Sequence, residues 1–139
     1  MPLLHMVSIQ RTLAPEHTVA TDLLTPVREL VAQHPQIEGV IFADLDGQEI
    51  SLHPPTQGES LRHCAIFSGI ALRRLTVAER LAGRNVVREV NLQGSEGAVM
   101  AMMVADENQL VVTITGDQAL SHLAGAVRRT VKRLEGLSR

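Results

Sequence analysis

Two carboxylates, two residues apart, are the clearest candidates for chemistry in this sequence. Asp44 and Asp46 follow the apolar run Gly39–Ala43 and precede Gly47. At the end of a buried strand, one such carboxylate could hold Mg²⁺ or attack phosphorus while the other serves as acid and base. The same residues are also typical of a β-hairpin, because Asp and Gly tolerate the positive φ of a tight turn.

The neighbouring residues favour the turn. The motif Asp44-Leu-Asp-Gly47 resembles the first motif of haloacid-dehalogenase phosphatases, but Gln48 stands where that family has Thr or Val. The only lysine, Lys132, falls on the polar face of the last predicted helix, and no acidic pair follows downstream that could complete a metal site. An EF-hand is excluded because the glycine comes two residues early. The spacing therefore predicts a hairpin turn, and a phosphatase remains the alternative reading.

Cysteine and histidine offer no further catalytic or metal-binding pattern. Cys64 is the only cysteine, which excludes an intramolecular disulfide and a cysteine-built zinc site. His63 precedes it, but neighbours on a helix point about 100° apart and do not form a ready nucleophile–base pair. The six histidines show no metal-ligand spacing. We therefore expect no enzyme, no cofactor and no metal site.

Composition bounds the class of protein. The chain has 139 residues, 45% of them apolar and 20% charged, which is typical of one globular domain. Its net charge of −2 and its two aromatic residues, Phe42 and Phe67, argue against a nucleic-acid binder. No apolar stretch approaches the ~18 residues of a membrane span, so we expect a cytoplasmic protein without membrane insertion. Residues 1–16 show no clear period and are expected to form an arm, with residues 17–139 as a single domain.

Hydrophobic periodicity predicts eight elements. A helix is expected from Asp22 to about His34, where Pro35 ends it. The remaining elements are strands Gly39–Ala43 and Gln48–His53, a long helix Glu59–Ala82, strands Asn85–Leu92, Ala98–Val104 and Gln109–Thr115, and a last helix capped by Asp117. The order α-β-β-α-β-β-β-α predicts an α+β fold, with a five-stranded antiparallel sheet and helices on both faces.

The long helix carries two apolar stripes, whereas packing on one sheet requires only one. The first stripe comprises small and apolar residues: Leu61, Cys64, Ala65, Ser68, Ala71, Leu72 and Leu75. The second lies roughly opposite and comprises Ile66, Phe67, Ile70, Val77 and Leu81, flanked by Arg62, His63, Arg73 and Arg74. Soluble monomers rarely expose such a patch, so the second stripe predicts self-association.

The strand after this helix supports the same prediction. Its apolar face is interrupted by Arg88, which is typical of an edge strand. An edge strand beside an exposed apolar helix can pair with its copy across a two-fold axis. We therefore expect a homodimer whose interface contains Ile66, Phe67, Ile70, Val77, Val86, Arg88 and Val90.

From about Asp22 to Leu137 the sequence resembles the roadblock / dynein-light-chain family. The resemblance rests on the element order, on the segment Ile37–Gly47 (IEGVIFADLDG) and on the long apolar helix followed by three strands. It implies a profilin-like fold and a homodimer built from the central helix and the third strand. It also implies a partnership with Ras-like small GTPases, as in bacterial gliding-polarity regulators and lysosomal scaffolds.

Members of this family act as GTPase-activating factors, adaptors or scaffolds through surfaces, so the resemblance implies no catalytic residue. For the GTPase partner, our candidate contacts are Arg62, Arg73 and Arg74, which could meet acidic groups. Two alternatives remain open. One is a ligand-sensing module built on the same type of sheet, and the other is a scaffold with no effect on nucleotide turnover.

Overall fold

Runs rich in β-branched residues and methionine form one five-stranded antiparallel sheet, in the strand order β2-β1-β5-β4-β3. The computed structural model describes residues 23–84, 86–116 and 120–137. The strands are β1 (Ile37–Asp44), β2 (Glu49–His53), β3 (Glu89–Gln93), β4 (Gly97–Val104) and β5 (Asn108–Thr115). Strands β3, β4 and β5 form the predicted meander, and β1 closes against β5.

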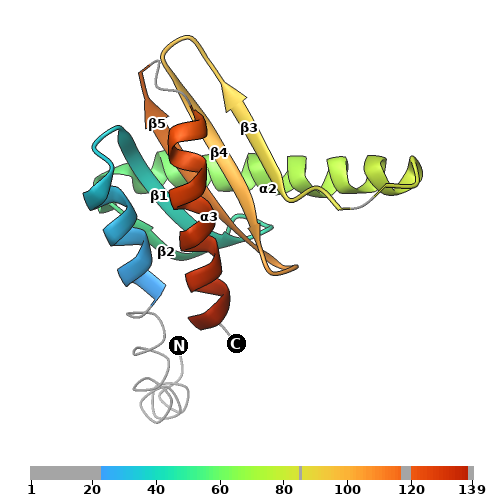
Figure 1. Ribbon diagram of the computed structural model, residues 1–139, viewed down its shortest axis with the longest axis horizontal. Helices are drawn as coiled ribbons and strands as arrows, with labels where there is room; N and C mark the ends of the chain where they lie inside the picture. The colour runs from blue at the N-terminus through green and yellow to red at the C-terminus, as the bar shows by residue number, and fades with distance from the viewer. Residues whose placement is uncertain (1–22, 85, 117–119, 138–139) are drawn as a thin grey trace, which may run out of the picture.

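Two helices cover one face of the sheet (Figure 1). They are the helix over residues 23–33 and α3 (Leu120–Leu137). Fully buried side chains of both helices and the sheet form one hydrophobic core, including Val27, Val40, Phe42, Met100, Leu110, Val112, Leu123, Val127 and Leu134. The regular spacing of these apolar residues on each helix explains why each buries a single stripe.

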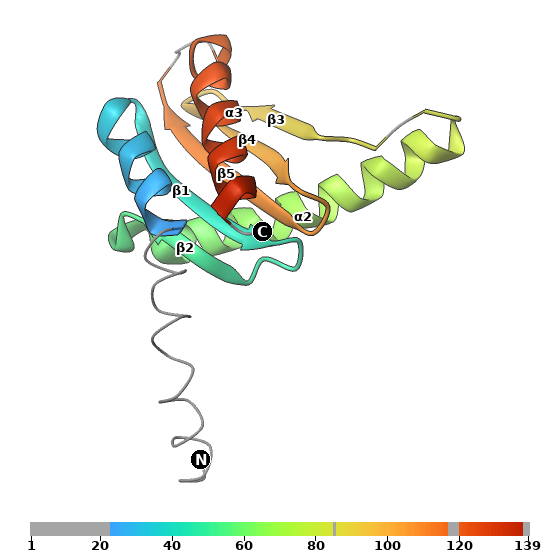
Figure 2. The ribbon, with the colours of Figure 1, turned by 60° about the horizontal axis from the view of Figure 1, so that its bottom comes forward.

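The long helix α2 (Gly58–Leu81) covers the opposite face, after a short 3₁₀ helix η1 (Pro55–Gln57). Its buried apolar side chains, Leu61, Ala65 and Leu72, form a second core with residues of the sheet that include Ile41, Ala43, Ala101 and Val111. Figures 1 and 2 show that the C-terminal part of α2 runs past the sheet. Gly83, with φ of 78°, follows the helix in the left-handed conformation that ends it.

The predicted α+β fold with helices on both faces is confirmed. Two details were wrong. Leu75 is 44% exposed, because α2 has passed the sheet after Leu72. The third strand begins at Glu89 and not at Asn85. The expected arm, residues 1–16, and the expected cap Asp117 lie outside the described residues. None of the described helices combines the length and apolar character needed to cross a bilayer.

Candidate functional site

The connection between β1 and β2 shows how the Asp44–Gly47 motif is used. Asp44 Oδ1 accepts backbone N–H bonds from Asp46 and Gln48, each at 2.9 Å, and the Gly47 N–H donates to the Asp44 carbonyl at 3.1 Å. Gly47 has φ of 89°, which a side chain would disfavour. The predicted hairpin turn is confirmed. In the described parts of the chain, no three His, Cys, Asp or Glu side chains gather where they could hold a metal ion.

This turn lies directly against α2. A Cβ atom on Gly69 would overlap the Leu45 carbonyl oxygen, and a Cβ atom on Gly47 would overlap Ile66. Both glycines are therefore required by close approach of backbone to backbone. The contact sets the position of α2 along the sheet.

Gln109, on β5, bonds to α2 and to the end of β1 from inside the core. Its side chain is 0% exposed, and its Nε2 donates to the carbonyls of Ala65 at 2.7 Å and Asp44 at 3.0 Å. The hydroxyl of Ser68 lies 2.7 Å from Gln109 Oε1. One amide thus links β5, α2 and the end of β1. Sequence reasoning missed this role, and the only available signal was a polar residue at the start of an apolar strand.

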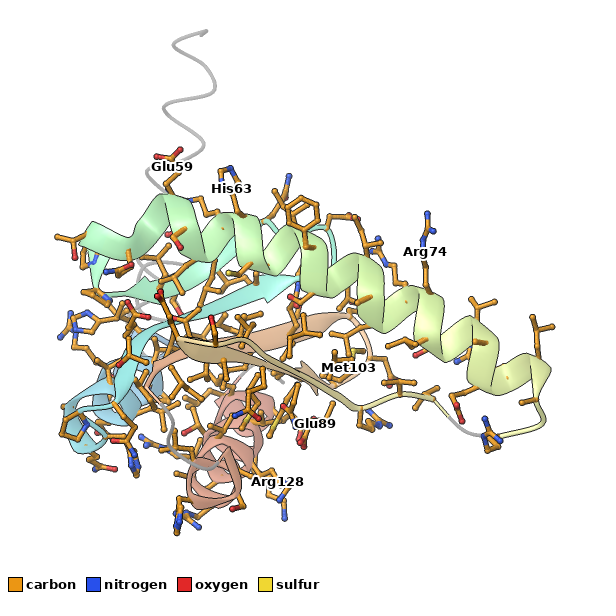
Figure 3. The ribbon with its side chains drawn as sticks, turned by 90° about the horizontal axis from the view of Figure 1, so that it is seen from above. Glu59, His63, Arg74, Glu89, Met103 and Arg128 are labelled. Atoms are coloured by element: carbon orange, nitrogen blue, oxygen red, sulfur yellow. The ribbon has the colours of Figure 1, made fainter. Side chains whose placement is uncertain are left out.

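The side of α2 that faces away from the sheet carries large apolar residues in solvent. We call Ile66, Ile70, Arg74 and Val77 the outer ridge; the three apolar members are 39%, 43% and 56% exposed. Figure 3 shows Glu59, His63 and Arg74 on this outward side of the helix. The second stripe predicted from the sequence is therefore exposed in the described chain.

Two of the three candidate arginines are held by the β1–β2 hairpin. Arg62 Nε lies 2.9 Å from Glu49 Oε1, and Arg73 Nη1 lies 2.7 Å from Asp46 Oδ1. Both pairs are exposed, and such pairs contribute only about 0–1 kcal/mol each. Arg74 forms no ion pair with any described residue. Of the three candidate arginines, Arg74 is therefore the one that can pair with a partner's carboxylate without first leaving a carboxylate of this chain.

A groove runs between α2 and the edge of the sheet at β3. We call it the β3-side groove; it has a volume of about 650 Å³. Its lining includes His63, Cys64 and Phe67 from α2, Leu92 from β3 and Val99 from β4. Phe67 is 70% exposed and Leu92 is 59% exposed, so two large apolar side chains of this groove face solvent.

Cys64 lies in this groove in the reduced form. Partial burial raises the pKa of its thiol, because the charged thiolate is less well solvated there. A raised pKa keeps the thiol protonated at neutral pH and lowers its reactivity. Cys64 thus belongs to the first, small and apolar stripe of α2, as a residue that is half-buried at the groove.

Strand β3 is an edge strand, as the sequence indicated. The Met103 N–H donates to the Arg88 carbonyl at 2.8 Å, so Arg88 and Met103 are a hydrogen-bonded pair of the antiparallel ladder. The peptide groups of Arg88 therefore point toward β4. Alternate residues of an antiparallel strand direct their peptide groups to opposite sides. The peptide groups that point to the free edge therefore belong to Glu89, Asn91 and Gln93.

The segment before β3 lies beside α2, and of its described residues Arg88 bonds to the sheet, through the Met103 N–H. The Val87 N–H donates to Thr76 Oγ1 of α2 at 3.2 Å, which explains why the predicted strand starts late. Val86 and Arg88 line a second groove, of about 560 Å³, together with Val77. Arg88 also lies near Asp106, with Nη1 3.7 Å from Oδ1.

The predicted interface residues thus lie in two grooves and on the outer ridge, and Val77 belongs to both the outer ridge and the second groove. Val77, Val86 and Arg88 share the second groove, whereas Phe67 lines the β3-side groove. Val90 packs against the core under α2. Ile66 and Ile70 lie on the outer ridge, and Ile66 contacts the hairpin turn at Gly47.

No protein-family model and no curated protein sequence matches this chain. Solved structures do match it. MglB of Myxococcus xanthus superposes with a TM-score of 0.75 at 18% sequence identity, covering 85% of this chain and 88% of that one. A Roadblock/LC7 domain from Streptomyces avermitilis gives a TM-score of 0.73 at 19% identity, covering 83% of this chain and 96% of that one.

Profilin IB of Acanthamoeba castellanii is also similar, with a TM-score of 0.54 at 16% identity, over 84% of this chain and 98% of that one. The chain therefore has the roadblock fold, which is profilin-like. The fold expected from the sequence resemblance is confirmed.

Proposed function

We propose that this chain is a homodimeric, non-enzymatic regulator or adaptor of a small Ras-like GTPase. Residues 17–139 would act as one domain in the cytoplasm. The observation that carries the proposal is the exposed apolar surface of α2 beside the free edge of β3, on a roadblock fold. Soluble proteins rarely leave such a surface uncovered.

The homodimer would form through the edge of β3. Antiparallel pairing about a two-fold axis at Asn91 uses the outward peptide groups of Glu89, Asn91 and Gln93. The same register sets Val90 opposite Leu92 of the copy, on the face of the sheet that carries α2. Phe67 and Leu92 would then be covered together, which removes the exposed apolar surface of the β3-side groove.

In this arrangement the outer ridge, whose apolar residues the sequence analysis placed in the dimer interface, would remain for the GTPase. It combines Ile66, Ile70 and Val77 with Arg74, an apolar surface with a cation that no described residue neutralises. Arg62 and Arg73 lie on the hairpin side and could exchange their exposed carboxylate partners for acidic groups of the GTPase.

The dimer is tested by light scattering at micromolar concentration. Phe67→Glu places a charge in the proposed interface and is expected to cost several kcal/mol of dimer stability, giving a monomer. Ser121→Glu, an exposed position on α3, is the matched control and should remain a dimer. A monomeric unmodified protein would contradict the proposal.

The proposed GTPase partnership is tested by recovering a small GTPase from the native cytoplasm on the immobilised protein. After purification, its affinity, its GTP hydrolysis and its nucleotide exchange are measured with the unmodified chain and with Arg74→Glu. We expect about tenfold weaker binding for Arg74→Glu, as for loss of one charge contact. Arg28→Glu, on the opposite face of the sheet, should bind normally. Recovery of a stoichiometric small metabolite and no GTPase would favour the ligand-sensing alternative.

A further inference from the structure

Cations are concentrated on α3, on the face of the sheet opposite to α2. Within Leu120–Leu137 the helix carries Arg128, Arg129, Lys132 and Arg133 but only one carboxylate, Glu135. The chain as a whole has a net charge of −2. The four basic side chains are exposed, so this helix presents a positive surface on a weakly acidic protein.

A groove of about 350 Å³ lies between this helix and β3. Met102 and Val131, which are 4% and 8% exposed, supply apolar side chains to its lining. Its charged lining consists of Arg88, Glu89, Arg128, Lys132 and Glu135. Figure 3 shows Glu89 and Arg128 on the α3 side of the β3 edge.

Both carboxylates of the groove are already bonded within the chain. Glu89 Oε1 accepts from Arg128 at 3.1 Å, and Glu135 Oε2 accepts the Ala105 N–H at 2.7 Å. Lys132, by contrast, forms no ion pair with a described residue, and neither does the neighbouring Arg129. Among the cations of the groove, Arg128 and Arg88 have the acidic partners Glu89 and Asp106. Lys132, with Arg129 beside the groove, therefore carries the positive charge that no described carboxylate pairs.

We infer that this groove binds a short acidic segment of a partner protein. An apolar side chain of the segment would rest on Met102 and Val131, and its carboxylates would pair with Lys132 and Arg129. A protein segment fits better than an anionic membrane, because Lys132 lies in a hollow with Arg129 beside it, and a segment can place its carboxylates on these two cations and away from Glu89 and Glu135. The anionic headgroups of a flat membrane would lie against Glu89 and Glu135 as well as against the cations, which is unfavourable.

The inference concerns the other face of the sheet and does not depend on the GTPase proposal. The probe is a fluorescein-labelled peptide with a leucine flanked on both sides by glutamates, and its affinity is measured by fluorescence anisotropy. We expect saturable binding, and about tenfold weaker binding for the double variant Arg129→Glu/Lys132→Glu, as for two exposed charge contacts. Amide NMR shifts should move at Val131 and Lys132 and not along the outer ridge.

Arg74→Glu makes a charge reversal on the α2 face and serves as the matched control, with unchanged peptide affinity. Light scattering of the double variant should match that of the unmodified chain, which separates this test from that of the dimer. Equal losses for Arg74→Glu and the double variant would show a non-specific charge effect and overturn the inference. So would absence of saturable binding, or binding to phosphatidylserine vesicles in place of the peptide.

Discussion

Gln109 is a fully buried polar side chain between an apolar strand and an apolar helix face. Its Nε2 donates to the buried carbonyl of Ala65 and to the carbonyl of Asp44 at the end of β1. The residue therefore couples the position of α2 to the hairpin turn that α2 contacts. The two arginines that join the same elements from outside are exposed and contribute less.

Replacing Gln109 with Leu is expected to lower the free energy of unfolding by about 1–3 kcal/mol, because its hydrogen bonds to the Ala65 and Asp44 carbonyls and to the Ser68 hydroxyl are lost. Urea unfolding at a fixed protein concentration measures the change. Gln48→Leu alters an exposed side chain of the turn and should change stability by less than about 0.5 kcal/mol. A similarly small change for Gln109→Leu would mean that the buried amide does not hold α2.

Gly69 offers a second test at this scale. Alanine normally stabilises a helix interior by about 0.5–1 kcal/mol relative to glycine. At Gly69 we expect the opposite sign, because the new Cβ overlaps the Leu45 carbonyl oxygen. Gly136→Ala on α3 is the matched control, since a Cβ there meets nothing within 4 Å. Thermal unfolding of both variants decides the point, and a stabilised Gly69→Ala would contradict the close packing of turn and helix.

β3 and α2 are the elements that extend beyond the packing of a single sheet. β3 leaves three outward peptide groups unpaired within the sheet, and α2 extends beyond the last residue that the sheet buries, Leu72. The end of β3 borders the β3-side groove, and the part of α2 beyond Leu72 borders the second groove. Edge strands left open in this way readily pair with another strand.

Asn91→Pro tests the role of the edge. Proline removes an N–H that points away from β4, so the fold should remain intact while pairing with a copy is lost. Sedimentation is expected to show a monomer, and circular dichroism an unchanged secondary structure. Asn91→Ala keeps the N–H and should stay dimeric. A dimeric Asn91→Pro would place the interface elsewhere.

At the scale of the whole molecule, the sheet separates two surfaces of different chemistry. The α2 side exposes apolar residues, and the α3 side exposes cations around a groove with apolar side chains in its lining. In the proposed dimer, covering Phe67 and Leu92 links folding to association, so stability should depend on protein concentration.

The melting temperature is therefore expected to rise by about 3 °C for each tenfold increase in protein concentration. Phe67→Glu should abolish this dependence and leave a lower, constant melting temperature. Differential scanning fluorimetry over two decades of concentration measures both. A melting temperature of the unmodified chain that does not change with concentration would contradict folding linked to association.

The order of the elements, the hairpin turn and the two stripes of α2 could be read from the sequence, because they depend on local properties. Periodicity along a helix or strand is set by neighbouring residues, and the Asp-Gly turn by the conformations those residues allow. The edge position of β3 was also readable, because Arg88 interrupts an apolar face. These signals depend on a few neighbouring residues and can be recognised without knowledge of the rest of the chain.

Tertiary structure alone decided where those elements stop and what they touch. Leu75 continues the buried stripe but is exposed, since the sheet ends beneath it. Val87 belongs to an apolar run but bonds to Thr76, because α2 passes within reach. Gln109 acquires its role from carbonyls that are 44 and 65 positions away in the chain. Such contacts join residues far apart in sequence, and only the packed arrangement of sheet and helices determines them.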